Sequence, residues 1–136
     1  MNPLFHEVFQ KTRLLSKELN LVLKDYDLFA SQWSVLYCVH RHEEMTLTNI
    51  WRYLNVEAPT VTRTVSRLVE LGWLTMCVGK DRREKIVRLS EEAVAKFPVI
   101  ETSIIQFENK LLKNLSGEEQ AMLIGLLKKL DKERSE

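Results

Sequence analysis

Residues 59–89 read PTVTRTVSRLVELGWLTMCVGKDRREKIVRL and combine two hydrophobic periods within one short segment. In the first half, the apolar side chains recur three and four residues apart, which is the period of a helix: Val61, Val65 and Leu68. Pro59 suits the first turn of that helix, and Gly72 suits its end. Residues 73–78 and 86–89 are rich in β-forming side chains and enclose a polar run. The segment therefore predicts a helix followed by a β-hairpin with a charged tip.

Two further helices are expected directly upstream. Residues 48–55 predict a helix of less than three turns, capped by Thr48 and ending at Asn55, a residue type that tolerates the left-handed backbone of a tight turn. Before it, Ser31 is expected to cap a helix that reaches about His42. The order helix, short helix, tight turn, helix, hairpin is that of a winged helix-turn-helix, whose second short helix enters the major groove of DNA.

The two ends of the chain predict amphipathic helices. Residues 4–26 carry apolar side chains at helical spacing, and Ser90 is a suitable cap for a long helix that follows it. Ser116 and Glu119 form the capping-box pattern of a last helix. The fold class expected is mostly α with a small β-hairpin wing.

Composition fits one globular domain over residues 1–136. The chain is 45% hydrophobic and 29% charged, and it has only four Gly and three Pro, which favours helices over a turn-rich β fold. No apolar run is long enough for a signal-peptide core or a membrane span, so we expect a cytoplasmic protein without a membrane partner.

The cysteines and histidines do not indicate a metal or redox site. Cys38 and Cys77 are far apart and lie among apolar neighbours, so buried, reduced, structural thiols are favoured over redox sensing. His40 and His42 are two residues apart, a spacing that separates them on a helix. We expect no metal and no cofactor.

Charge is distributed unevenly along a nearly neutral chain. Residues 59–89 hold seven Lys and Arg against three Asp and Glu, which is a local net charge of +4, while the rest of the chain carries −3. A helical wheel places the polar side chains of residues 59–72 opposite the apolar ones. The candidate DNA contacts on this face are Thr60, Thr62, Arg63, Ser66 and Arg67. Arg can donate two hydrogen bonds to guanine, whereas the alternative is an ordinary solvated face.

The predicted hairpin tip adds a second basic cluster, which makes the solvated alternative weaker. Its candidate DNA contacts are Lys80, Asp81, Arg82, Arg83 and Lys85. Asp81 stands two residues before Arg83, a spacing at which its carboxylate can pair with the guanidinium and fix its direction. The other three basic residues are then left for phosphates.

Three stretches resemble the MarR family of bacterial regulators. They are residues 28–36, residues 59–74 and, most specific, residues 81–92, with the sequence DRREKIVRLSEE. The resemblance implies a winged helix-turn-helix lobe at residues 28–90. It also implies an obligate homodimer joined by helices in residues 1–26 and 91–136, with one recognition helix in each half-site of a pseudo-palindromic operator. Exposed apolar side chains on the end helices fit a dimer, although packing within one chain is the alternative.

The resemblance also implies an effector site between the dimerisation helices and the DNA-binding lobe, for a small aromatic or lipophilic acid. The aromatic candidates for its lining are Phe9, Phe29, Trp33, Tyr37 and Phe107. A filled core is the favoured alternative, because aromatic side chains at helical spacing mostly pack.

The sequence departs from the family pattern at several positions. Trp51 stands where Ala is usual, so altered packing between the two short helices is expected. Met76 replaces a frequent basic residue, and Ala93 stands where Gly is usual.

The function expected is that of a sequence-specific, double-stranded-DNA-binding transcriptional regulator, a repressor released by an effector. The alternatives are a winged-helix module that binds proteins and, more weakly, an enzyme. No phosphate-binding loop or nucleophile elbow favours an enzyme. Salt-dependent binding to duplex DNA separates the regulator from the interaction module.

Overall fold

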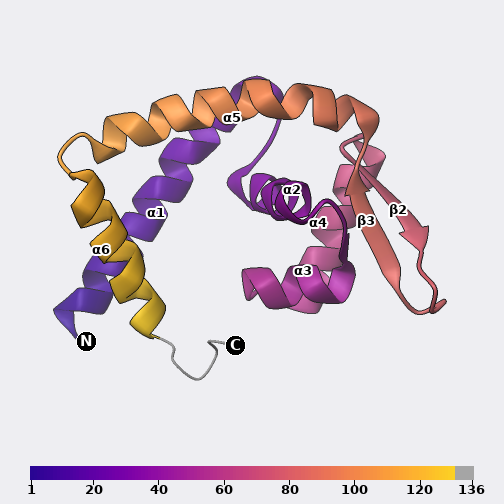
Figure 1. The fold of residues 1–136 in the computed structure, drawn as a ribbon, viewed down its shortest axis with the longest axis horizontal. Helices are drawn as coiled ribbons and strands as arrows, with labels where there is room; N and C mark the ends of the chain where they lie inside the picture. Colours follow the sequence, from indigo (N-terminus) through magenta and orange to yellow (C-terminus); the bar gives the residue numbers. More distant parts are fainter. Residues whose placement is uncertain (131–136) are drawn as a thin grey trace.

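In the computed structural model, which describes residues 1–130, the chain forms six α-helices, a 3-10 helix and a small antiparallel sheet. The helices are α1 (Pro3–Leu23), α2 (Ala30–His42), α3 (Leu47–Leu54), α4 (Ala58–Glu70), α5 (Glu91–Leu112), α6 (Gly117–Lys128) and the 3-10 helix η1 (Lys24–Tyr26). The strands are β1 (Met45–Thr46), β2 (Leu74–Val78) and β3 (Lys85–Leu89). In Figure 1, α5 crosses the top of the molecule, with α1 and α6 at one end and the helix-turn-helix and hairpin at the other. The predicted fold class is confirmed.

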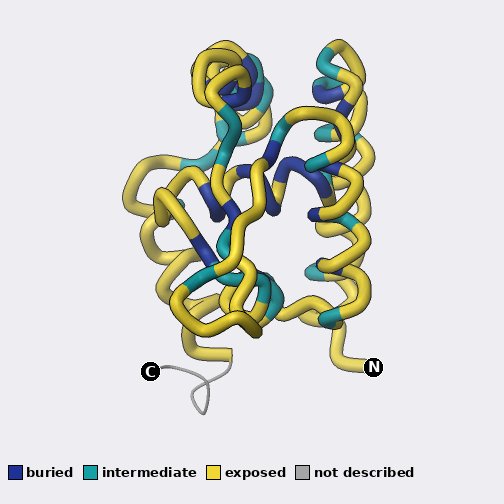
Figure 2. Tube along the Cα trace, turned by 90° about the vertical axis from the view of Figure 1, so that its right-hand side faces the viewer, coloured by how far each residue is buried: buried dark blue, intermediate teal, exposed yellow. Residues whose placement is uncertain are grey.

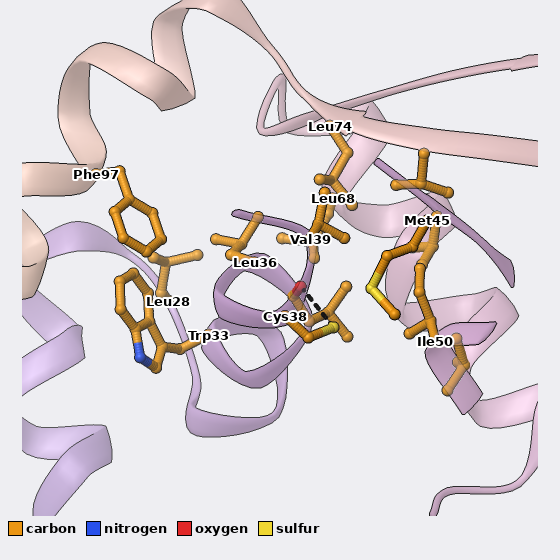
Figure 3. Packing of buried hydrophobic residues seen from close by; sticks show 14 of the residues in the cluster. Leu28, Trp33, Leu36, Cys38, Val39, Met45, Ile50, Leu68, Leu74 and Phe97 are labelled. Atoms are coloured by element: carbon orange, nitrogen blue, oxygen red, sulfur yellow. Dashed lines mark hydrogen bonds between the residues drawn. The ribbon is translucent and has the colours of Figure 1, made fainter. Parts of the chain in front are cut away.

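A single hydrophobic core holds the helix-turn-helix and the sheet together. Helix α2 lies at its centre and contributes most of its length to burial (Figure 3). Val61, Val65 and Leu68 of α4 are buried, so the predicted apolar face of that helix is the face that packs. Packing of this kind leaves the opposite face of α4 in solvent.

The sheet contains a strand that the sequence did not indicate. Its order is β1-β3-β2, with Met45 opposite Val87 and Thr46 opposite Ile86. Strand β1 has only two residues, so no alternation of apolar and polar side chains marks it. It forms because β3 offers a free edge at the point where the chain enters α3.

Two predicted helix caps are wrong. Helix α2 begins one residue before Ser31, and the Gln32 side chain accepts a hydrogen bond from the Phe29 N–H at 2.9 Å. Helix α3 is capped by Thr46, whose Oγ1 accepts from the Asn49 N–H at 3.1 Å, and not by Thr48. At the start of both helices, more than one polar side chain can reach a backbone N–H group. The residue that has an extended backbone directly before the first helical turn takes the capping position.

The other predicted helix ends are confirmed. Asn55 and Gly72 end α3 and α4 with φ of 57° and 85°, both in the left-handed region. Ser90 caps α5, and its hydroxyl also donates to the Gly72 carbonyl at 2.7 Å, which ties the end of α4 to the start of α5. Ser116 and Glu119 form the expected capping box of α6.

The terminal helices bury little of their surface against the rest of the chain. Leu23 is the only buried residue of α1, and α6 has none. In Figure 2, the trace near the marked N-terminus is accordingly drawn mostly as exposed. No helix in the described part of the chain is long and apolar enough to cross a membrane.

Candidate nucleic-acid interface

Helix α4 presents a continuous polar face. All five candidate contacts on this helix are exposed: Thr60, Thr62, Arg63, Ser66 and Arg67. The Thr62 hydroxyl donates to the Ala58 carbonyl at 3.0 Å, which leaves its oxygen able to accept a hydrogen bond. This face therefore combines cationic donors with small side chains that do not block close approach to a groove.

The two arginines of α4 differ in their surroundings. Arg67 forms an exposed ion pair with Glu70 at 3.1 Å. Arg63 forms no ion pair with any carboxylate of residues 1–130. A new partner must displace Glu70 to reach Arg67, whereas Arg63 has no such competitor.

The hairpin tip carries its basic side chains fully outward. The exposed residues are Lys80, Asp81, Arg82, Arg83 and Lys85. Asp81 Oδ1 accepts from the Arg83 backbone N–H at 3.0 Å and lies 3.8 Å from Arg83 Nε. The carboxylate thus fixes the turn backbone by a good hydrogen bond, and its ion pair with the guanidinium is the longer and weaker contact.

Arg88, which belongs to the basic segment, is engaged elsewhere. Its guanidinium forms an ion pair with Glu44 at 3.1 Å. The pair joins β3 to the loop before β1, so this arginine stabilises the sheet. The basic side chains available at the hairpin are therefore those of its tip.

The aromatic candidates for an effector site are spread over the subunit. Trp33 is buried and stacks on Phe97 with ring centroids 4.8 Å apart (Figure 3), and Tyr37 lies 6.4 Å from Trp33. The others have no such aromatic neighbour in the described residues: Phe9 and Phe29 are exposed, and Phe107 is half-buried. Three hollows within residues 1–130 are lined by other side chains.

The two cysteines have different environments. Cys38 is buried, its thiol contacts the Val35 carbonyl at 3.2 Å (Figure 3), and burial raises the pKa of that thiol to about 11. Cys77 is exposed, so the expectation that both thiols are buried is wrong for Cys77. The reason is that β2 is an edge strand with only Leu74 buried, so its apolar neighbours in sequence do not enclose it.

A hollow between α3 and the start of α4 was not predicted. It has a volume of about 480 Å³ and is lined by Trp51 and Arg52 of α3, by the turn at residues 55–57 and by Ala58 and Pro59 of α4. The Arg52 guanidinium carbon lies 5.4 Å from the centre of the Trp51 ring. The departure at Trp51 was the only sequence signal at this place.

Known proteins resemble this chain over almost all of its length. The MarR family model matches residues 28–85. An uncharacterized HTH-type transcriptional regulator of Bacillus subtilis, YwoH, is 46% identical over 117 residues, which cover 86% of this chain and 85% of the relative.

Solved structures give the same assignment. A mutant MarR from E. coli complexed with operator DNA matches with a TM-score of 0.86 and 28% identity, covering 95% of this chain and 94% of that one. Wild-type E. coli MarR in its apo form matches with a TM-score of 0.75 and 30% identity, covering 96% and 95%. With its winged helix-turn-helix and its close relative YwoH, the chain belongs to the MarR family.

Proposed function

We propose that this protein is a transcriptional regulator that binds a pseudo-palindromic operator as a homodimer. The observation that carries the proposal is the exposed, cationic face of α4 beside a hairpin with a basic tip. The match to a MarR bound to operator DNA supports it, because the two chains share one fold over most of their length.

Base reading is assigned to α4. Its buried face fixes the helix against the core, and its polar face enters the major groove. Arg63, which has no competing carboxylate partner among residues 1–130, donates two hydrogen bonds to a guanine. Thr62 and Ser66 contact base edges, a thymine methyl group or the adjoining phosphates.

The hairpin tip is assigned to the neighbouring minor groove. Arg83 enters the groove or its edge, and Asp81 holds the turn that carries it. Lys80, Arg82 and Lys85 contact phosphates, which gives binding a strong dependence on salt.

The terminal helices are assigned to the dimer interface. Helix α6 and the turn directly after it expose large apolar side chains: Met122, Leu123, Ile124, Leu126, Leu127 and Leu130. Helix α1 adds Leu4, Phe5 and Phe9, each more than two-fifths exposed. Apolar surface of this extent favours burial against a second subunit.

Repression, release by a small aromatic or lipophilic acid, and a cytoplasmic location complete the proposal. They rest on the resemblance to the family. An effector site lined by Phe9, Phe29, Trp33, Tyr37 and Phe107 requires the second subunit to enclose it, because four of these rings are exposed or half-exposed in one subunit.

Footprinting on the DNA that flanks the protein's own gene tests the proposal. We expect protection of a palindromic site at moderate salt and loss of binding as salt rises. A scrambled duplex of the same length is the control. Equal affinity for both duplexes would reject sequence-specific regulation, and absence of binding to any duplex would favour the protein-interaction module.

A further inference from the structure

The indole of Trp51 is placed at the edge of the helix-turn-helix, where it has a covered side and an open side. The residue is half-buried and packs against the core cluster. The turn between α3 and α4 is intact beside it, because the Val56 N–H donates to the Trp51 carbonyl at 3.1 Å. A large ring at a position usually held by Ala is thus accommodated without loss of the tight turn.

Arg52 lies over that ring. Its guanidinium carbon is 5.4 Å from the ring centre, within the range of a cation–π interaction. Arg52 forms no ion pair with a carboxylate of residues 1–130, whereas Arg67, Arg83 and Arg88 each do. A planar guanidinium on an aromatic face keeps its N–H donors available at its edge.

The hollow beside this pair is suited to a segment of nucleic-acid backbone. Its lining combines the indole and Val56 with the Arg52 cation, so an apolar sugar edge and an anionic phosphate both have a counterpart. Glu57 is the one carboxylate in the lining, and it disfavours an anion at its own side of the hollow. A phosphate is therefore expected at the Arg52 side.

The position of the hollow is also consistent with a contact to DNA bound by α4. Pro59, which lines it, is followed directly by Thr60 and Thr62 of the reading face. In Figure 1, α3 and the hairpin tip lie toward the same lower edge of the molecule. A duplex engaged by α4 thus passes close to α3.

We propose that Arg52, held by Trp51, binds a DNA backbone phosphate next to the bases read by α4. The inference rests on the proposed function and extends the interface to α3. A phosphate contact carries no sequence information, so its expected role is to fix the register of the recognition helix and to add affinity on every sequence.

Binding measurements with three variants test the assignment. Arg52→Ala should weaken binding about tenfold on cognate and scrambled duplexes alike and reduce the salt slope by about one. Arg52→Lys keeps the charge, so it should keep the slope while losing part of the affinity. Trp51→Ala, which restores the residue usual in the family, should lower affinity with the helical circular dichroism unchanged.

A phosphate scan locates the contact. Each backbone phosphate flanking the half-site is replaced in turn by a neutral methylphosphonate. At one position, the replacement should weaken binding by wild type but have no further effect on Arg52→Ala. The inference would be overturned if Arg52→Ala bound DNA with the affinity and salt slope of wild type. It would also be overturned if the loss caused by Arg52→Ala added to the loss caused by the methylphosphonate at every position. Either outcome would leave DNA binding itself intact. Failure of the wild type to bind any duplex would overturn the proposed function itself.

Discussion

A single carboxylate has two partners at the hairpin tip, and their distances rank them. Asp81 Oδ1 lies 3.0 Å from the Arg83 backbone nitrogen and 3.8 Å from its Nε. The sequence suggested the contact to the guanidinium, but the shorter contact closes the turn. Asp81 therefore shapes the tip mainly through the backbone.

This ranking gives a prediction with a definite sign. Asp81→Ala should weaken operator binding even though it removes a negative charge near a polyanion, because the turn loses its hydrogen bond. Asp81→Asn is the matched control, since its amide oxygen can keep the bond without the charge, and it should bind as well as wild type or better. Fluorescence anisotropy measures both. Tighter binding by Asp81→Ala would reduce the tip to a non-specific basic patch.

Arg63 is predicted to supply specificity. Arg63→Ala should cost about 1–3 kcal/mol of binding free energy on the cognate duplex and clearly less on a scrambled one. Arg67→Ala should cost less than Arg63→Ala, because Arg67 must give up its ion pair with Glu70 to bind DNA. Titration of both duplexes at one salt concentration gives the comparison. Equal losses on the two duplexes would assign Arg63 to phosphates alone.

The thiols are predicted to react at very different rates. At pH 8, a disulfide reagent should modify the exposed Cys77 quickly, whereas Cys38 should react only after unfolding. Burial raises the pKa of Cys38 to about 11, so almost no thiolate is present in the folded protein at that pH. Counting the thiols that react before and after adding denaturant tests this. Cys77→Ser should abolish the fast phase, and a fast phase that survives would contradict the assignment.

The helices and the hairpin could be predicted from sequence because each has a local signal. The period of Val61, Val65 and Leu68, the left-handed Asn55 and the Ser116 capping box all act within a few residues of chain. Strand β1 could not be predicted, because its two residues are defined only by pairing with a strand some forty positions later. The caps of α2 and α3 failed because several polar residues compete locally and tertiary structure decides among them.

The end of α4 offers a test of a backbone requirement. Gly72→Ala should destabilise the protein by about 1–2 kcal/mol, because φ is 85° there and an added Cβ has open space, so the cost is backbone strain alone. Gly117→Ala is the control, with equally open space and no left-handed backbone, and it should change stability by less than about 0.5 kcal/mol. Urea unfolding at fixed protein concentration measures both. Equal effects would show that strain at Gly72 is not the cause.

The sequence was sufficient to predict which residues of the candidate site are exposed. It was not sufficient to predict the contacts that these side chains make with one another. A helical wheel is sufficient to place Arg63 and Thr62 outward, because the buried face of α4 fixes the opposite face. The ion pair of Arg67 and the position of Arg52 over Trp51 depend on side-chain geometry that spacing alone does not define. The exposure of Cys77 depends on which strand occupies the edge of the sheet.

At the scale of the whole molecule, the dimer assignment predicts that assembly and DNA binding are lost together. Leu127→Glu on α6 should give a monomer in sedimentation and greatly weaken operator binding, because one recognition helix then acts alone. Val94→Glu is the control. It also lies on an exposed apolar position, but near the start of α5 at the opposite end of the molecule, and it should remain a dimer (Figure 1). A stable Leu127→Glu monomer with unchanged operator affinity would reject the dimer.

The short strand β1 joins the hairpin to the chain directly ahead of α3, through the pairs Met45–Val87 and Thr46–Ile86. A tilt of the hairpin therefore moves the helix-turn-helix with it. The proposed major-groove contacts of α4 and minor-groove contacts of the tip would then keep a constant separation. In the proposed dimer, the distance between half-sites is set separately, by the helices that join the two subunits. If the proposed assignments hold, base preference among relatives can diverge through α4 while operator spacing diverges through α1 and α6, each without disturbing the other.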